Sequence, residues 1–300
     1  MITNIVRAIQ TQMPRLAEEG YEDHAQDKPL RSRMLKKASI FFYVLSLAAI
    51  VAWVALQLAA PNGSAGKNVK ILLERGPFSV LDFKPEQPRP KAVILFGTGD
   101  GGWSGFEEAI CRTLQMHGYE AVGIDSKLYA KSDYDLAILQ TDINNIAQTV
   151  RGKYGNPAPP LIVGGWSMGA AQAIAAAGGP HPPRGLIGVL LLDPCSRGRY
   201  GLRFSDESNV LPTGPGTFGM DEFTQTMGNV RVVQWHAVED PIDSRTWLKA
   251  LTAPHKEFDF GQTGHYYDRD RADFLTQLVT SVNWITGPDE NAVMTTRAQP

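Results

Sequence analysis

The stretch that decides the fold is LIVGGWSMGAAQAIAAAGG, residues 161–179. It opens with an apolar run typical of a buried strand, and it closes with small, helix-favouring residues that end at a glycine pair. Between them, Gly165, Ser167 and Gly169 form a G-x-S-x-G pattern. This pattern is typical of a strained strand-to-helix turn that lifts a serine hydroxyl above a sheet, where glycines avoid clashes with the neighbouring backbone. Ser167 is therefore the predicted nucleophile.

The surrounding chain supplies the context that so short a pattern needs. Short apolar runs alternate with longer helical stretches, which predicts a mostly parallel sheet covered by helices. The candidate strands are residues 92–96, 121–124, 161–163, 188–192 and 230–235. Apolar residues at helical spacing predict a helix over about 134–151, and a final helix is expected over 271–285. Together with the serine turn, this order predicts the α/β-hydrolase fold.

A serine at its free pKa is a poor nucleophile, so a base must follow it, and in this fold the chain order is serine, acid, histidine. Of six histidines, His265 in the stretch GHYY (264–267) comes late, after the last strand-like run and before the final helix. It is the predicted base, against the alternative of an ordinary surface histidine. Asp240, which ends the run VRVVQWHAVED (230–240) on a turn before a proline, is the predicted acid that holds the imidazole. Asp193, at the end of the preceding strand, is the rival for this role.

A tetrahedral intermediate also needs donors for its oxyanion. We expect these to be the backbone N–H of Met168 and that of Asp100, with Thr98 as an alternative to Asp100. The second donor lies in the glycine-rich loop GTGDGGW (97–103), which lacks the Lys-Ser/Thr pair of a phosphate-binding P-loop. The indoles of Trp103 and Trp166 are expected to contact the substrate.

An uncharged stretch near the N-terminus, residues 39–60, is long enough to cross about 30 Å of hydrocarbon as a helix. Arg and Lys residues lie just before it, and positive flanks stay in the cytoplasm. The domains expected are a cytoplasmic tail (1–38), a transmembrane anchor (39–60), a linker (61–68), a periplasmic hydrolase domain (69–287) and a C-terminal tail (288–300). A cleaved signal peptide is the alternative, although its charged region would be unusually long.

Composition limits the other possibilities. The formal net charge of −2 does not supply the positive field that nucleic-acid binding requires. The two cysteines, Cys111 and Cys195, lack the spacing of a zinc site and are too few for a disulfide framework, while their pairing stays open. We expect neither a metal nor a cofactor.

Four stretches together resemble a known family. TGDGGWSGFE (98–107), GIDSKLY (123–129), GGWSMGA (164–170) and GHYYDRD (264–270) look like motifs, in the same order, of the VirJ and AcvB family of bacterial virulence-associated α/β-hydrolases. The resemblance covers about residues 90–285. It implies the roles already assigned to Ser167, Asp240, His265 and Asp100. Two departures weaken the inference about substrate: the family usually has an aromatic residue where Met168 stands and an acidic one close to Ala171.

The family includes periplasmic aminoacyl-phosphatidylglycerol hydrolases. The resemblance therefore implies an inner-membrane enzyme that cleaves the aminoacyl ester of lysyl- or alanyl-phosphatidylglycerol. Arg197, Arg199 and Arg203, in an insertion over 196–229, could meet the lipid phosphate, or they could belong to a solvated basic loop. The alternative functions are an esterase or thioesterase for another envelope ester, and a non-catalytic adaptor for secretion-system or envelope proteins.

Overall fold

A computed structural model describes residues 66–288, except positions 209, 243 and 262. The predicted cytoplasmic tail and transmembrane anchor lie outside the described residues, as do the C-terminal positions 289–300. Within the part described, no helix is both long and apolar enough to span a membrane.

An eight-stranded sheet forms the centre of the domain, in the spatial order β1-β2-β4-β3-β5-β6-β9-β10. Its strands are β1 (Lys67–Leu73), β2 (Gly76–Phe83), β3 (Val93–Gly97), β4 (Glu120–Ile124), β5 (Leu161–Trp166), β6 (Leu186–Leu192), β9 (Arg231–Ala237) and β10 (His255–Phe260). The β1–β2 and β2–β4 pairs are antiparallel, and the pairs from β4 to β10 are parallel. All five strands expected from the apolar runs are present, each within two or three residues of its expected bounds.

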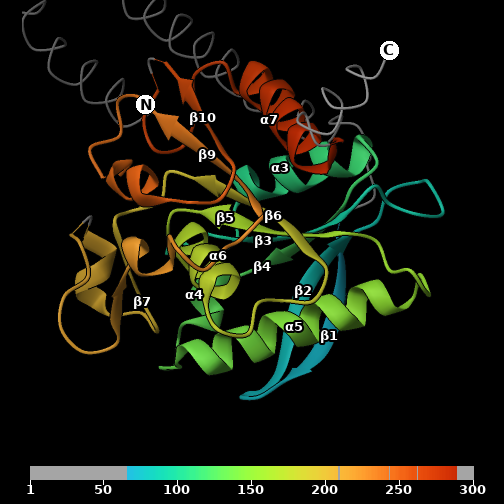
Figure 1. The fold of residues 1–300 in the computed structure, drawn as a ribbon, viewed down its shortest axis with the longest axis horizontal. Coiled ribbons are helices and arrows are strands. Elements are labelled where there is room, and N and C mark those ends of the chain that lie inside the picture. Colours follow the sequence, from blue (N-terminus) through green and yellow to red (C-terminus); the bar gives the residue numbers. More distant parts are fainter. Residues whose placement is uncertain (1–65, 209, 243, 262, 289–300) are drawn as a thin grey trace, which may run out of the picture. The chain divides into compact units, whose positions relative to one another are not determined.

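Helices cover both faces of this sheet, as Figure 1 shows: α3 and α7 lie on one face, and α5 and α6 lie on the other. The helices are α3 (Gly105–Met116), α4 (Ser126–Tyr129), α5 (Leu136–Gly152), α6 (Met168–Gly178) and α7 (Arg271–Thr286), with 3₁₀ segments η2 (Phe204–Ser208), η3 (Met220–Phe223) and η4 (Thr246–Ala250). The predicted helices at 134–151 and 271–285 correspond to α5 and α7. This is the parallel sheet covered by helices that the sequence predicts.

Strand β3 shows how the sequence produces two cores. Successive side chains of a strand point to opposite faces, and all of β3 is apolar up to its final glycine. Val93 and Leu95 accordingly pack with α5 and α6, whereas Ile94 and Phe96 pack with α3 and α7. All four are at most 1% exposed, and each such burial contributes roughly 1.5–3 kcal/mol of transfer free energy.

The N-terminal hairpin corrects one predicted boundary. Residues 61–68 were expected to form a linker, but Lys67 and Asn68 are the first residues of β1 and pair with Asp82 and Leu81 of β2. The composition of this stretch is that of a linker, with a charged and a polar residue next to glycine. Its strand conformation comes from pairing with β2, a long-range contact that the local sequence does not encode.

A buried polar cluster ties the edge of the sheet to the C-terminal end of α5. Glu120 on β4 is fully buried and accepts hydrogen bonds from the Lys153 ammonium and, at 2.6 Å, from the Tyr154 hydroxyl. Lys153 also contacts Asp82 on β2 at 3.2 Å. Burial raises the pKa of the Glu120 carboxyl to about 7, against the opposing effect of the bonds from Lys153 and Tyr154.

Candidate active site

Ser167 lies on the turn between β5 and α6, where the sequence predicts a nucleophile. Its backbone has φ 53° and ψ −114°, a conformation that side-chain-bearing residues rarely adopt. The turn is held from both sides, because Ser167 N donates to Leu192 O (2.9 Å) and Ser167 O accepts from Ala171 N (3.1 Å). The strained turn that the G-x-S-x-G pattern predicts is therefore present.

The glycines of this pattern are required by close backbone packing. A Cβ atom at Gly165 would lie 2.5 Å from the carbonyl carbon of Gly169, and one at Gly169 would overlap the carbonyl of Gly97. Gly169 N also donates to Thr98 O at 2.9 Å. Three backbone segments thus meet without intervening side chains, which places the loop after β3 directly beside the serine turn.

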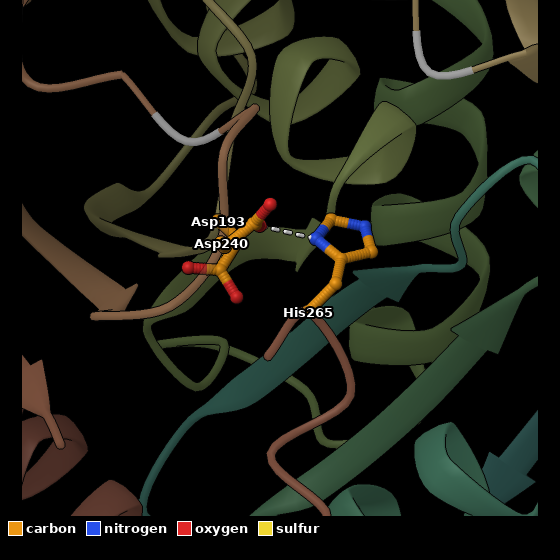
Figure 2. Close-up of side chains that lie close together, drawn as sticks. All are labelled: Asp193, Asp240 and His265. Carbon is orange, nitrogen blue, oxygen red and sulfur yellow. Dashed lines mark hydrogen bonds and ion pairs between the residues drawn. The ribbon is translucent and has the colours of Figure 1, made fainter. Parts of the chain in front are cut away.

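His265 and Asp240 form a hydrogen-bonded pair, which Figure 2 shows with Asp193 nearby. Asp240 Oδ2 lies 2.5 Å from His265 Nδ1, and Asp240 Oδ1 accepts from Ile242 N at 3.0 Å. The Asp240 side chain is 1% exposed and that of His265 is 20% exposed. A carboxylate at Nδ1 favours the tautomer with its proton there, which leaves Nε2 unprotonated and able to accept a proton.

Asp193, the rival acid, takes a different role. It is fully buried after β6, and its Oδ1 accepts from Ala237 N (2.7 Å) at the end of β9. Its carboxylate therefore fixes the strand end from which the Asp240 turn departs. Asp193, Asp240 and His265 each have a possible metal-ligand atom within 4.8 Å of the others. We assign the pair of His265 Nδ1 and Asp240 Oδ2 to a catalytic hydrogen bond, which needs no metal.

The two expected oxyanion donors lie beside the serine. Met168 and Asp100 line the same cavity as Ser167, and neither backbone N–H has an acceptor in the described part of the chain. The alternative donor, Thr98, is excluded because its N–H donates to Ile124 O at 3.0 Å. Backbone N–H groups aimed at this position would stabilise a developing oxyanion.

Trp166, expected as a substrate contact, does not line the cavity and instead packs against the histidine loop. The side chain is buried, its ring centroid lies 4.7 Å from that of His265, and its Nε1 donates to His265 O at 2.9 Å. Next to the histidine, Tyr267 is fully buried and stacks on Phe274 of α7 at 4.2 Å. These contacts fix the histidine loop to the strand that carries Ser167, so Trp166 positions the base.

Trp103, the other expected substrate contact, does not line the cavity either. Its ring stacks on Phe83 at 6.0 Å and covers Gly123, where any Cβ would overlap the indole. The next residues start α3 with a capping box, in which Ser104 accepts from Phe106 N and Glu107 accepts from Ser104 N. The glycine-rich motif therefore contributes to the cavity at Asp100 and to packing from Trp103 onward.

A cavity of about 470 Å³ connects these residues to the insertion between β6 and β9. Ser167, Asp240 and His265 line it, together with residues of the insertion, which include Arg197 and Arg199. Tyr266 also lines it, although the sequence indicated no role for this residue. The insertion contains a two-stranded antiparallel sheet formed by β7 (Arg197–Arg199) and β8 (Thr217–Gly219). It is thus an ordered wall of the cavity. Cys195 also lines it and forms no disulfide with the buried Cys111.

This fold and this site define a serine hydrolase of the α/β-hydrolase class. Residues 91–178, which include the glycine-rich loop and the serine turn, match the family model described as bacterial virulence protein (VirJ). The family indicated by the sequence motifs is confirmed over this part of the chain. No curated protein matches the sequence.

Solved structures agree on the fold. An esterase domain from Rhodothermus marinus has a TM-score of 0.54 and 17% identity, with coverage of 73% of this chain and 97% of that domain. A membrane phospholipase A, described as a bacterial virulence factor, has a TM-score of 0.56 and 12% identity, with coverage of 87% and 100%. Monoglyceride lipase from Saccharomyces cerevisiae has a TM-score of 0.54 and 14% identity, with coverage of 74% and 95%. At such identities the likeness concerns the fold.

Proposed function

We propose that this protein hydrolyses the aminoacyl ester of an aminoacyl-phosphatidylglycerol, with Ser167 as nucleophile. The observation that carries the proposal is the hydrogen-bonded His265–Asp240 pair in the cavity that Ser167 also lines. The match to the VirJ family supports a role in bacterial virulence, and the likeness to esterases, lipases and a phospholipase is consistent with a lipid ester as substrate.

The proposed reaction gives each of these groups one role. His265 Nε2 takes the proton of the Ser167 hydroxyl as its oxygen attacks the ester carbonyl, and Asp240 stabilises the imidazolium that forms. The oxyanion accepts hydrogen bonds from Met168 N and Asp100 N. Collapse of the intermediate releases phosphatidylglycerol, which takes the proton from His265. Water, activated by the same histidine, then attacks the aminoacyl-serine and releases the free amino acid.

An aminoacyl ester carries a protonated α-amine beside the carbonyl, and this charge calls for an acidic partner. The neutral Ala171 lines the cavity where the family usually has an acid nearby. Asp193 is bonded to Ala237 N, whereas the Asp100 carboxylate has no ion-pair partner in the described part of the chain. We therefore assign ammonium recognition to the Asp100 side chain.

The substrate assignment predicts release of a free amino acid. Full-length protein in neutral detergent, incubated with lysyl- or alanyl-phosphatidylglycerol, should yield phosphatidylglycerol and lysine or alanine, measured by mass spectrometry. The Ser167→Ala variant is the control for spontaneous hydrolysis. If the aminoacyl lipid stays intact while simple acyl esters are cleaved, the general-esterase alternative replaces this proposal. If neither is cleaved, the non-catalytic adaptor replaces it.

The proposed location is the inner membrane, with the N-terminus cytoplasmic and the hydrolase domain periplasmic. It is supported by the uncharged stretch 39–60 and the preceding Arg31, Arg33, Lys36 and Lys37. A tethered domain would work at a surface where its lipid substrate is concentrated. Fused at the C-terminus, a reporter that is active only in the periplasm should give signal, and activity of a cytoplasm-only reporter would contradict this topology.

A further inference from the structure

The insertion between β6 and β9 carries three arginines, and two of them are neutralised by carboxylates. Arg199 is nearly buried; it donates to Asp206 Oδ2 at 2.8 Å and to the carbonyls of Thr213 and Pro215. Arg203 is exposed and forms a two-bond pair with Asp133, at 2.7 and 2.6 Å. This pair raises the pKa of Arg203 and lowers that of Asp133. Neither guanidinium carries an uncompensated charge.

Arg197 differs from both. Its Nε donates to Pro212 O at 3.3 Å and its Nη2 to Thr217 Oγ1 at 3.1 Å, and both of these acceptors are neutral. Among the residues that the structure describes, no carboxylate lies within ion-pair distance of it. The side chain is exposed and lines the cavity that contains Ser167 and His265. Arg197 therefore places a positive charge, with Nη1 still available as a donor, at the wall of the candidate active site.

The surface next to Arg197 is apolar. Val210 and Leu211 line the same cavity yet are 61% and 43% exposed, and the bond from Arg197 to Pro212 O holds this segment against the guanidinium. Tyr266, on the histidine loop, also lines the cavity and is 54% exposed. A cation beside exposed apolar side chains matches a ligand with an anionic head and hydrocarbon chains.

We propose that Arg197 and the segment Val210–Pro212 form a specificity subsite for an anionic phospholipid, in which Arg197 binds the phosphodiester and Val210 and Leu211 contact the acyl chains. The subsite deepens the proposed function and rests on it for the ester that is cleaved. In an aminoacyl-phosphatidylglycerol the phosphodiester is one glycerol unit away from the ester, so both groups can occupy a single cavity. A guanidinium is suited to this role because its planar donors match phosphate oxygens.

A direct binding measurement tests whether the charge of Arg197 binds the phosphodiester, independently of any turnover. Calorimetry on the full-length protein in neutral detergent would measure Kd for dihexanoyl-phosphatidylglycerol, with a protein-free detergent blank. Arg197→Gln should raise this Kd about tenfold, the scale of losing one charge-assisted hydrogen bond, whereas Arg197→Lys should raise it less. Arg203→Gln is the matched control, because it removes the same charge from the same insertion away from the cavity, and it should leave Kd within about twofold.

A second comparison separates a lipid from a free phosphodiester. Glycerophosphoglycerol has the same head without chains, and inorganic phosphate has neither chains nor diester. Dihexanoyl-phosphatidylglycerol should bind more tightly than both, and the double substitution Val210→Ser, Leu211→Ser should raise its Kd about fivefold while changing that of glycerophosphoglycerol less than twofold. Equal Kd values for the three ligands would overturn the lipid subsite.

Other outcomes also decide the proposal. If wild-type protein binds none of these ligands, or if Arg197→Gln and Arg203→Gln raise Kd equally, Arg197 is not a phosphodiester site. Thermal unfolding of each variant shows whether weaker ligand binding reflects misfolding. If Arg197→Gln does not fold, the Kd of Arg197→Lys decides the proposal instead. If the protein hydrolyses aminoacyl-phosphatidylglycerol but substitution of Arg197 does not change Kd, only the subsite is refuted. If the protein binds the lipid but does not hydrolyse the aminoacyl ester, only the proposed function is refuted.

Discussion

The Ser167→Ala variant should lose ester hydrolysis by about 10³-fold or more and keep its fold. Removing Oγ removes the atom that forms the acyl-enzyme in the cavity that Ser167 shares with the His265–Asp240 pair. The strained backbone turn is held by main-chain bonds to Leu192 and Ala171, which alanine preserves. We expect kcat/KM to fall while the melting temperature stays within a few degrees.

A second buried serine provides the control for this substitution. Ser281 on α7 is fully buried and accepts from Trp235 Nε1 at 3.1 Å, away from the cavity. Ser281→Ala should lower the melting temperature, because it leaves the indole N–H without its acceptor, and it should retain turnover. A correctly folded Ser167→Ala protein with near-normal turnover would refute the nucleophile and, with it, the serine-hydrolase mechanism.

The parts of the site that the sequence predicts are those encoded locally. The serine turn needs glycine at fixed offsets because backbones touch there, so the pattern around Gly165 and Gly169 carries the geometry itself. The buried parallel strands appear as apolar runs because both of their faces are covered. The order of serine, aspartate and histidine follows from the fold, which is why Asp240 and His265 could be selected.

The sequence is less informative about residues whose role depends on contacts distant in sequence. Trp103 and Trp166 lie in the same motifs as Asp100 and Ser167, but one packs on Phe83 and the other donates to His265 O. Nothing in the local sequence separates an indole that meets substrate from one that supports the site. The sequence indicated Arg197 and Arg199 as candidates for lipid contact but did not predict strands β7 and β8, since two three-residue strands show no periodicity.

Asp240→Asn should lower kcat/KM by about 10⁴-fold, the second large effect expected at this site. Asparagine keeps the size of the side chain but loses the negative charge that stabilises the imidazolium. Its amide can also donate to Nδ1 and favour the tautomer that carries its proton on Nε2, where no proton can then be accepted. The effect should appear mainly in kcat, because no substrate contact is assigned to this side chain.

Asp193→Asn is the matched comparison, since this carboxylate lies in the same cluster but is bonded to Ala237 N. An asparagine oxygen can still accept that bond, so the turn after β9 should persist, and the loss in kcat/KM should be at least tenfold smaller than for Asp240→Asn. The melting temperature is the more sensitive readout for Asp193, which is buried. A larger loss of activity in Asp193→Asn than in Asp240→Asn would transfer the role of the acid to Asp193, because the residue that stabilises the imidazolium must show the greater dependence on its charge.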